Sequence, residues 1–127
     1  MAPPQPDTAE PGEAVLLVDD ELAAREAVAE RLRELGYRVL EASDGPAALH
    51  LLDGGARIDM LVNDVGLPNG MNGRQVAEAV RERRPKIPLL FITGYAGVEL
   101  PPGSTVIDKP FDLDTLARLL QAALATH

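Results

Sequence analysis

The chain has 127 residues, which favours one domain built around a single hydrophobic core. Its formal net charge of -8 argues against a nucleic-acid partner, because neutralising phosphates requires clustered Lys and Arg. It contains no cysteine, which excludes disulfides, a thiol nucleophile and cysteine-ligated metal sites. Aromatic residues make up only 3% of the chain, so we expect the core to consist of aliphatic side chains.

The N-terminal segment differs in composition from the rest of the chain. Residues 1–12 are rich in proline and contain almost nothing that could pack, which predicts a disordered leader ahead of a domain that covers residues 13–127. The segment lacks the basic region and apolar core of a secretory signal, and no apolar stretch approaches the ~20 residues of a membrane-spanning helix. We therefore expect a cytoplasmic protein with no membrane partner.

Apolar runs with the length of β-strands recur along the chain. They are short, mostly continuous and rich in Val, Leu and Ile, which is typical of strands buried on both faces of a parallel sheet. The predicted strands cover residues 14–18, residues 37–42, the run that ends at Asp64, residues 87–92 and residues 105–107.

Amphipathic helical stretches separate these runs. The first is predicted over residues 21–35, with Ala24, Val28, Leu32 and Leu35 on one face. The later helices are predicted over residues 47–53 after the start signal Asp44-Gly45-Pro46, over residues 73–84 before Pro85, and from the N-cap Asp112 onward with Leu113, Leu116, Leu120 and Leu124 as the apolar stripe.

The alternation of strands and helices predicts an α/β domain with a five-stranded parallel sheet and right-handed crossovers. The segment between Thr93 and Lys109 departs from the alternation, because Pro101-Pro102-Gly103 interrupts it. The fourth helix is therefore expected to be short or absent, with little more than a turn around residues 96–100.

Polar residues stand at the carboxyl ends of four of the predicted strands. Asp19 and Asp20 follow the first strand, Asp64 ends the third, Thr93 follows the fourth, and Lys109 lies just beyond the fifth. In an open parallel sheet this edge is where ligands bind, so we expect these side chains to converge on one site.

Four motifs occur in order at these strand ends: Val18-Asp19-Asp20-Glu21, Asn63-Asp64 followed by Pro68, Phe91-Ile92-Thr93-Gly94 and Lys109-Pro110-Phe111. In these motifs the chain resembles the receiver domain of two-component response regulators, over about residues 14–125. It is similar to the subgroup with Phe-x-Thr-Gly-Tyr after the fourth strand. The resemblance implies a flavodoxin-like sheet of order 2-1-3-4-5 with helices on both faces.

The chemistry of such an edge points to phosphoryl transfer. A carboxylate can attack a phosphoryl group and form an aspartyl phosphate if a cation neutralises the charge that repels the donor, and we assign Asp64 as this nucleophile. Neighbouring acidic side chains form a hard oxygen site that suits Mg2+ with several waters, with Asp20 and Asp64 as direct ligands and Asp19 acting mainly through water. An acidic run at a strand-to-helix junction is also a common N-cap, which is the structural alternative.

The resemblance assigns roles to further residues. It implies that the backbone carbonyl of Gly66 is a metal ligand, and that the Lys109 ammonium contacts a phosphoryl oxygen. It also implies that the Thr93 hydroxyl donates to another phosphoryl oxygen after phosphorylation, and that the Lys109-Pro110 peptide bond is cis. We expect no chemical role for His50 or His127.

Several positions depart from the common receiver pattern. Val106 stands where the family usually has the Tyr or Phe whose ring turns inward on activation, so we expect Tyr95 to supply a substitute ring. The loop over residues 69–73 has an extra residue, as in receivers that belong to or serve hybrid histidine kinases. Arg81, Arg83 and Arg84 are expected to form a solvated helix end.

The function predicted from the sequence is that of a stand-alone receiver. It accepts a phosphoryl group on Asp64 from a phosphohistidine on a histidine kinase or histidine phosphotransfer protein, and it catalyses its own phosphorylation and dephosphorylation with Mg2+ as cofactor. It signals through an unknown downstream protein target or by onward phosphotransfer. The alternatives are a phosphorylation-independent interaction module and a flavodoxin-like small-ligand binder, the latter disfavoured because no phosphate-cradling loop follows the first strand.

Overall fold

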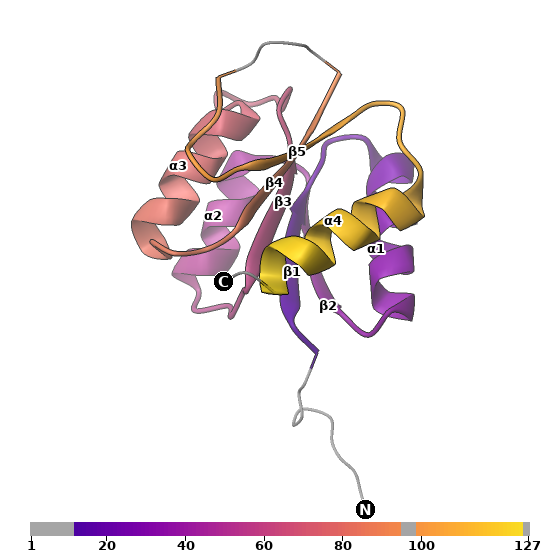
Figure 1. The fold of residues 1–127 in the computed structure, drawn as a ribbon. Coiled ribbons are helices and arrows are strands. Elements are labelled where there is room, and N and C mark those ends of the chain that lie inside the picture. Colours follow the sequence, from indigo (N-terminus) through magenta and orange to yellow (C-terminus); the bar gives the residue numbers. More distant parts are fainter. Residues whose placement is uncertain (1–11, 95–98, 126–127) are drawn as a thin grey trace, which may run out of the picture.

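The computed structural model describes residues 12–94 and 99–125 as a parallel β-sheet between two layers of helices (Figure 1). These residues contain five strands and four helices. In chain order they are β1 (Ala14–Val18), α1 (Leu22–Glu34), β2 (Arg38–Ala42), α2 (Gly45–Asp53), β3 (Met60–Asp64), α3 (Gly73–Arg83), β4 (Leu89–Thr93), β5 (Thr105–Asp108) and α4 (Leu113–Ala125).

All five strands are parallel and lie in the order β2-β1-β3-β4-β5. The fold class and strand order predicted from the sequence are confirmed. The register places Asp64 beside Ile92 and Thr93 beside Asp108. Because residues in register lie at the same height in the sheet, the polar ends of β3, β4 and β5 reach the same edge.

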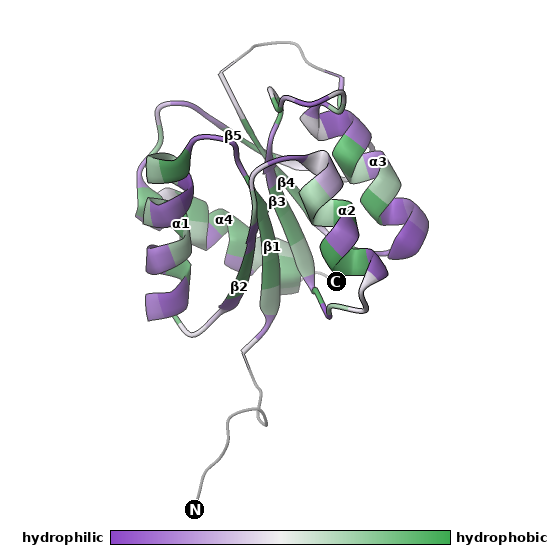
Figure 2. Cartoon of the chain, turned by 180° about the vertical axis from the view of Figure 1, so that it is seen from behind, coloured by the Kyte–Doolittle hydropathy of each residue, from purple (hydrophilic) through white to green (hydrophobic). Residues whose placement is uncertain are grey.

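Helices cover both faces of the sheet. α1 and α4 lie on one face, while α2 and α3 lie on the other (Figure 1). Figure 2 shows strongly apolar central strands between helices whose outer sides are hydrophilic. Every residue of β1, β3 and β4 is buried, which explains why these strands read as nearly continuous apolar runs.

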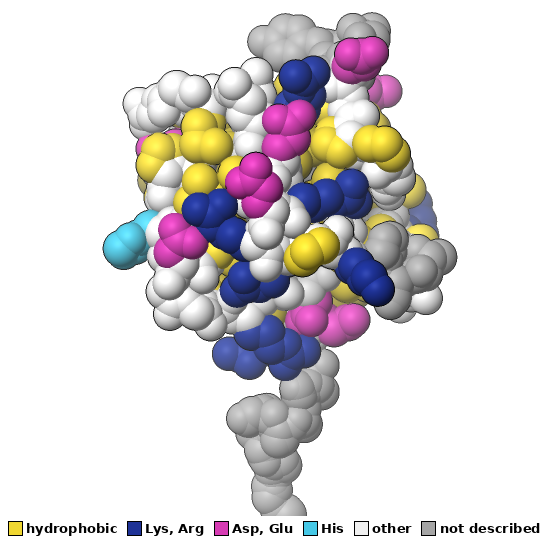
Figure 3. All heavy atoms as spheres, turned by 90° about the vertical axis from the view of Figure 1, so that its left-hand side faces the viewer, with side chains coloured by type: hydrophobic (Ala, Val, Ile, Leu, Met, Phe, Trp, Pro, Cys, Tyr) yellow, Lys and Arg dark blue, Asp and Glu magenta, His cyan; other side chains and the backbone are white. Residues whose placement is uncertain are grey.

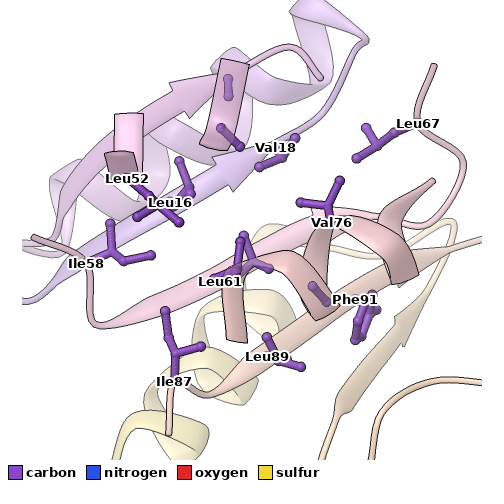
Figure 4. Close-up of a cluster of buried hydrophobic side chains, with 14 of the residues drawn as sticks. Leu16, Val18, Leu52, Ile58, Leu61, Leu67, Val76, Ile87, Leu89 and Phe91 are labelled. Atoms are coloured by element: carbon purple, nitrogen blue, oxygen red, sulfur yellow. The ribbon is translucent and has the colours of Figure 1, made fainter. Parts of the chain in front are cut away.

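Two aliphatic clusters form the core, one on each face of the sheet. The cluster beneath α2 and α3 includes Leu16, Leu61 and Val76, which point toward one another between the sheet and the helices (Figure 4). The cluster beneath α1 and α4 includes Leu17 and Leu120. The predicted aliphatic core is therefore present on both faces.

All four described helices begin with a side-chain cap, which is Glu21 for α1 and the predicted Asp112 for α4. The Asp44 carboxylate accepts a hydrogen bond from the Ala47 N–H at 2.9 Å, so α2 begins at Gly45, two residues earlier than predicted. Asn72 and Gln75 form a reciprocal capping box at the start of α3, with hydrogen bonds of 2.9 and 3.0 Å. The residue that follows Asn72 is therefore fixed as the first residue of α3.

The predicted apolar face of α1 is partly wrong. Val28 and Leu32 are buried as predicted, but Ala24 is exposed and Leu35 is 46% exposed. The inward face is rotated so that Arg25 occupies the position expected for Ala24. An arginine can lie there because its guanidinium finds polar partners at the end of the sheet.

Two strands begin later than predicted because local hydrogen bonds compete with the sheet. The Tyr37 N–H donates to the Leu32 carbonyl at the end of α1, and β2 begins one residue later, at Arg38. The Ile87 N–H donates to the Arg84 carbonyl in a turn, so β4 begins at Leu89 instead of residue 87.

The arginines at the end of α3 are partly exposed, as expected for a solvated helix end, but they also bond to groups from other elements. Arg83 pairs with Asp53 of α2, with 2.7 Å between Nε and Oδ1, and Arg84 donates to the Ala56 carbonyl at 3.0 Å. Arg81 donates to backbone carbonyls of two loops. Figure 3 shows the basic side chains spread over the α2 and α3 face, among acidic ones.

The link between β4 and β5 contains no helix in its described residues, Gly94 and residues 99–104. The turn expected around residues 96–100 falls mostly on residues 95–98, which lie outside the described residues, as do residues 1–11 of the predicted leader. No helix in residues 12–94 and 99–125 is both long and apolar enough to cross a bilayer.

Gly73 lies so close to the end of β3 that a side chain does not fit. A Cβ atom on Gly73 would lie 2.2 Å from the Asp64 carbonyl oxygen and 2.7 Å from the Val65 Cα. We predict that Gly73→Ala lowers the free energy of unfolding by ~1–3 kcal/mol through overpacking, measured by urea denaturation. Gly54→Ala is the control, since its Cβ would meet the His50 carbonyl oxygen at an ordinary 3.4 Å. Equal losses in both variants would contradict the prediction.

Candidate functional site

The polar residues expected at the carboxyl edge of the sheet lie together there. Asp64 ends β3, Thr93 ends β4, and Lys109 follows β5. The Lys109 N–H donates to the Thr93 carbonyl at 2.8 Å, which carries the β4–β5 pairing up to the site. Asp19 continues β1 in the same way, because its N–H donates to the Ala42 carbonyl at 3.1 Å.

The Asp64 carboxylate is buried and held by one donor on each oxygen. Its Oδ1 accepts a hydrogen bond from the Gly66 N–H at 2.8 Å. Its Oδ2 accepts one from the Lys109 Nζ at 2.5 Å. Both donors orient the carboxylate, while the Lys109 charge compensates part of its desolvation.

Lys109 is the cation that faces these carboxylates. Its side chain is 47% exposed, so it reaches the site from the solvent side. The hydrogen bond to Asp64 raises the pKa of Lys109, burial lowers it, and the negative charges of Asp64, Asp19 and Asp20 raise it further. The ammonium therefore stays charged at neutral pH.

Asp19 and Asp20 add negative charge beside this pair. Asp19 is buried, and its Oδ1 accepts a hydrogen bond from the Glu21 N–H at 3.0 Å, whereas Asp20 is exposed. Burial raises the pKa of Asp19, and the charges of Asp64 and Asp20 raise it further, against the lowering effects of the Glu21 N–H and of Lys109. The site thus holds three carboxylates against one ammonium.

The donors at this edge suit a magnesium ion. Within residues 12–94 and 99–125, no cluster of three or more His, Asp or Glu side chains is arranged to hold a metal by itself. Mg2+ does not require such a cluster, because it typically takes one or two carboxylates and keeps several waters. The carboxylates of Asp19, Asp20 and Asp64 are hard oxygen donors that face a single ammonium, so the site can accept a further cation. Gly66, the expected carbonyl ligand, is exposed beside Asp64.

Two of the three positions expected to take part in conformational switching, Thr93 and Val106, are among the described residues. Thr93 is buried at the end of β4, while Val106 on β5 is 44% exposed and pairs in register with Phe91. Tyr95 lies outside the described residues. The Lys109-Pro110 peptide bond is cis.

Arg25 is a residue of the site that the sequence analysis missed. Its Nη1 donates to the Asp19 carbonyl at 2.9 Å, and its Nε pairs with Glu41 of β2 at 3.1 Å. The guanidinium therefore ties the start of α1 to the turn that carries the acidic pair. The signal was present, since Arg25 shares the helical spacing of the buried residues Val28 and Leu32.

Asn63 is named in a motif of the sequence analysis, which assigned it no role. It precedes Asp64 on β3 and is completely buried, and its Nδ2 donates to the Gly73 carbonyl at 2.8 Å. The signal was an amide inside an otherwise apolar strand, where a buried polar group needs a partner.

Residues 15–121 match the response regulator receiver domain family. The chain belongs to this family. Its fold is that of receiver domains found in response regulators and sensor kinases of two-component signalling.

Curated relatives carry a matching domain inside longer proteins. The sensor kinase CckA of Brucella abortus is 35% identical over 117 residues, which are 87% of this chain and 12% of the kinase. The response regulator protein FleR of Pseudomonas aeruginosa is 36% identical over 119 residues, which are 89% of this chain and 24% of FleR. The receiver therefore corresponds to a small part of these relatives.

Solved structures share the fold over nearly their whole length. The receiver domain from the hybrid histidine kinase CckA has a TM-score of 0.78 at 38% identity, covering 87% of this chain and 98% of that one. The response regulator receiver protein from Sinorhizobium medicae WSM419 has a TM-score of 0.82 at 31% identity, covering 91% and 96%. The expected similarity to receivers of hybrid kinases is confirmed. The match to the receiver family also argues against the alternative function of a flavodoxin-like small-ligand binder.

We predict that Arg25, which is mostly shielded from solvent, is important for stability. Arg25→Met keeps the apolar stem but removes the donors to Asp19 and Glu41, and should lower the free energy of unfolding by ~1.5–3 kcal/mol, measured by urea denaturation. Arg33→Met is the matched control, because Arg33 pairs with the same Glu41 but has 50% of its side chain exposed. The control should lose at most ~1 kcal/mol. A loss in Arg33→Met as large as in Arg25→Met would count against this assignment.

Proposed function

We propose that this receiver accepts a phosphoryl group on Asp64 from a phosphohistidine of a histidine kinase or histidine phosphotransfer protein, in a reaction that depends on Mg2+. The observation that carries the proposal is the buried Asp64 carboxylate in contact with the Lys109 ammonium, beside the buried carboxylate of Asp19. This arrangement supplies a nucleophile and a cation at one strand edge.

In the proposed reaction an Asp64 carboxylate oxygen forms a bond to phosphorus while the bond between phosphorus and the donor imidazole nitrogen breaks. The electron pair of that bond returns to the imidazole ring. Lys109 then shifts from the Asp64 oxygen to an oxygen of the bound phosphoryl group, where its positive charge stabilises the negative charge of that oxygen. A bound magnesium ion supplies further positive charge against the repulsion between the carboxylates and the anionic donor.

The acidic pair and the neighbouring backbone would hold the cation. Asp20 and Asp64 are the proposed direct ligands together with the Gly66 carbonyl, and Asp19 acts mainly through water. Support comes from the exposure of Asp20 and Gly66 and from the excess negative charge around Asp19. Hydrolysis of the Asp64 phosphate would then use water that enters beside Gly66.

The proposed output is a change in protein binding or onward phosphotransfer. The Thr93 hydroxyl would donate to a phosphoryl oxygen, and Tyr95 would supply the ring that Val106 cannot. We further propose that the protein is cytoplasmic and that the receiver domain follows a leader over residues 1–12. A phosphorylation-independent interaction module is the second candidate, but the intact set of Asp64, Lys109 and Asp19 favours phosphorylation.

Phosphorylation with a small phosphodonor tests the assignment of Asp64. Incubation with acetyl phosphate and Mg2+ should add one acid-stable, base-labile phosphoryl group, located by mass spectrometry after borohydride reduction. Asp64→Asn should abolish it, whereas Asp108→Asn should not, because that carboxylate is exposed at the same sheet edge but outside the buried pair. Phosphotransfer from histidine kinases would be profiled with the same variants.

Two outcomes would contradict this function. Label on a residue other than Asp64 would displace the nucleophile. Absence of any label, with unchanged spectra on adding beryllium fluoride and Mg2+, would favour the interaction module.

Magnesium binding should stabilise the folded domain. A ligand that binds only the native state adds ~2.7 kcal/mol at 100 times its dissociation constant, so the thermal midpoint should rise with Mg2+ concentration. Asp20→Asn should weaken this response, because it removes a proposed ligand. Glu26→Gln is the matched control, since it removes one exposed negative charge from α1 outside the site. An unchanged response in Asp20→Asn would exclude Asp20 as a ligand.

A further inference from the structure

Asn63 is a buried amide whose presence the packing of the core does not explain. It has 0% exposure, and its Oδ1 is buried without a hydrogen-bond partner among the described residues. A buried acceptor without a partner lowers stability. Leucine has nearly the same shape and would avoid this loss.

Asn63 donates a hydrogen bond to the Gly73 carbonyl, but this carbonyl does not need Asn63 as a donor. Gly73 is the first residue of α3, so its carbonyl is placed to accept the helical hydrogen bond from the Ala77 N–H. The Asn63 Nδ2 adds a second donor to the same oxygen at 2.8 Å. The amide therefore adds a connection between β3 and α3 at the expense of an orphaned acceptor.

This connection holds the loop that follows Asp64. The Gly73 N–H donates to the Val65 carbonyl at 2.7 Å, while the Gly73 carbonyl is held by Asn63. Gly73 is thus fixed from both sides, and it lies too close to Asp64 to accept a Cβ. The loop that it closes contains Gly66, whose N–H donates to Asp64 Oδ1 at 2.8 Å.

We propose that Asn63 is a positioning residue for the phosphoryl-acceptor site. Through Gly73 its amide fixes the backbone at Val65 and Gly66, and this backbone orients the Asp64 carboxylate and presents the Gly66 carbonyl to a cation. The part that concerns the cation rests on the proposed function. The connection between Asn63, Gly73 and the Gly66 N–H does not.

The test is Asn63→Leu, which removes the donor and the orphaned acceptor together. The free energy of unfolding should stay equal or rise, measured by urea denaturation. The amides of Gly66 and Gly73 should exchange with solvent about tenfold faster without Mg2+, as expected from the loss of one hydrogen bond. The Mg2+ dissociation constant, from an NMR titration, should rise by about the same factor.

Val80→Ala is the matched control, because Val80 is completely buried in the cluster beneath α2 and α3 but lies about two helical turns beyond Gly73. Its cavity should lower stability. Its Mg2+ affinity and the exchange of Gly66 and Gly73 should remain within about twofold of native values, as for sites that do not couple. The control separates loss of stability from loss of positioning.

Native exchange rates at Gly66 and Gly73 together with native Mg2+ affinity in Asn63→Leu would overturn the proposal and reduce Asn63 to a packing residue. If that variant does not fold, Asn63→Val decides by the same measurements. Failure of the native protein to bind Mg2+ or to be phosphorylated would refute the proposed function instead. Faster exchange in Asn63→Leu would still support the connection to the loop in that case.

Discussion

The balance of charge at the carboxyl edge of the sheet governs this domain. Three carboxylates, Asp19, Asp20 and Asp64, lie with one ammonium, that of Lys109, and two of the carboxylates are buried. Such an arrangement opposes folding unless donors and cations are close at hand. The Gly66 and Glu21 N–H groups, Lys109 and a bound cation are the means by which a receiver can keep its acidic residues in place.

The fold provides these groups from separate parts of the chain. Parallel strands bring Asp64, Thr93 and Lys109 to the same edge, because Asp64 pairs with Ile92 and Thr93 pairs with the residue before Lys109. Side chains behind the edge then fix the turns between strands and helices. Arg25 holds the Asp19 carbonyl after β1, and Asn63 holds Gly73 after β3. The site therefore depends as much on these backbone anchors as on its charged residues.

The sequence predicted the strands and the edge where the polar residues meet, because the buried strands are nearly continuous apolar runs with polar residues at their ends. The order of the strands came from the resemblance to receiver domains. It failed where a polar side chain turns inward. Arg25 lies on the buried face of α1 because Glu41 and the Asp19 carbonyl receive it, and neither partner is visible from helical periodicity. The partners of the arginines that end α3 were missed for the same reason, since Asp53 and the Ala56 carbonyl come from other elements.

The strands that carry the site differ in how deeply they are buried. β5 is an edge strand that pairs only with β4, and it exposes Val106. Every residue of β3 and β4 is buried. Segments with few buried contacts open locally at a lower free energy than the interior. The Lys109 ammonium thus follows a strand that is expected to open more easily, whereas the Asp64 carboxylate ends a strand that is expected to open less easily. Local opening of β5 alone can change the distance between Lys109 and Asp64 while the interior of the domain stays folded.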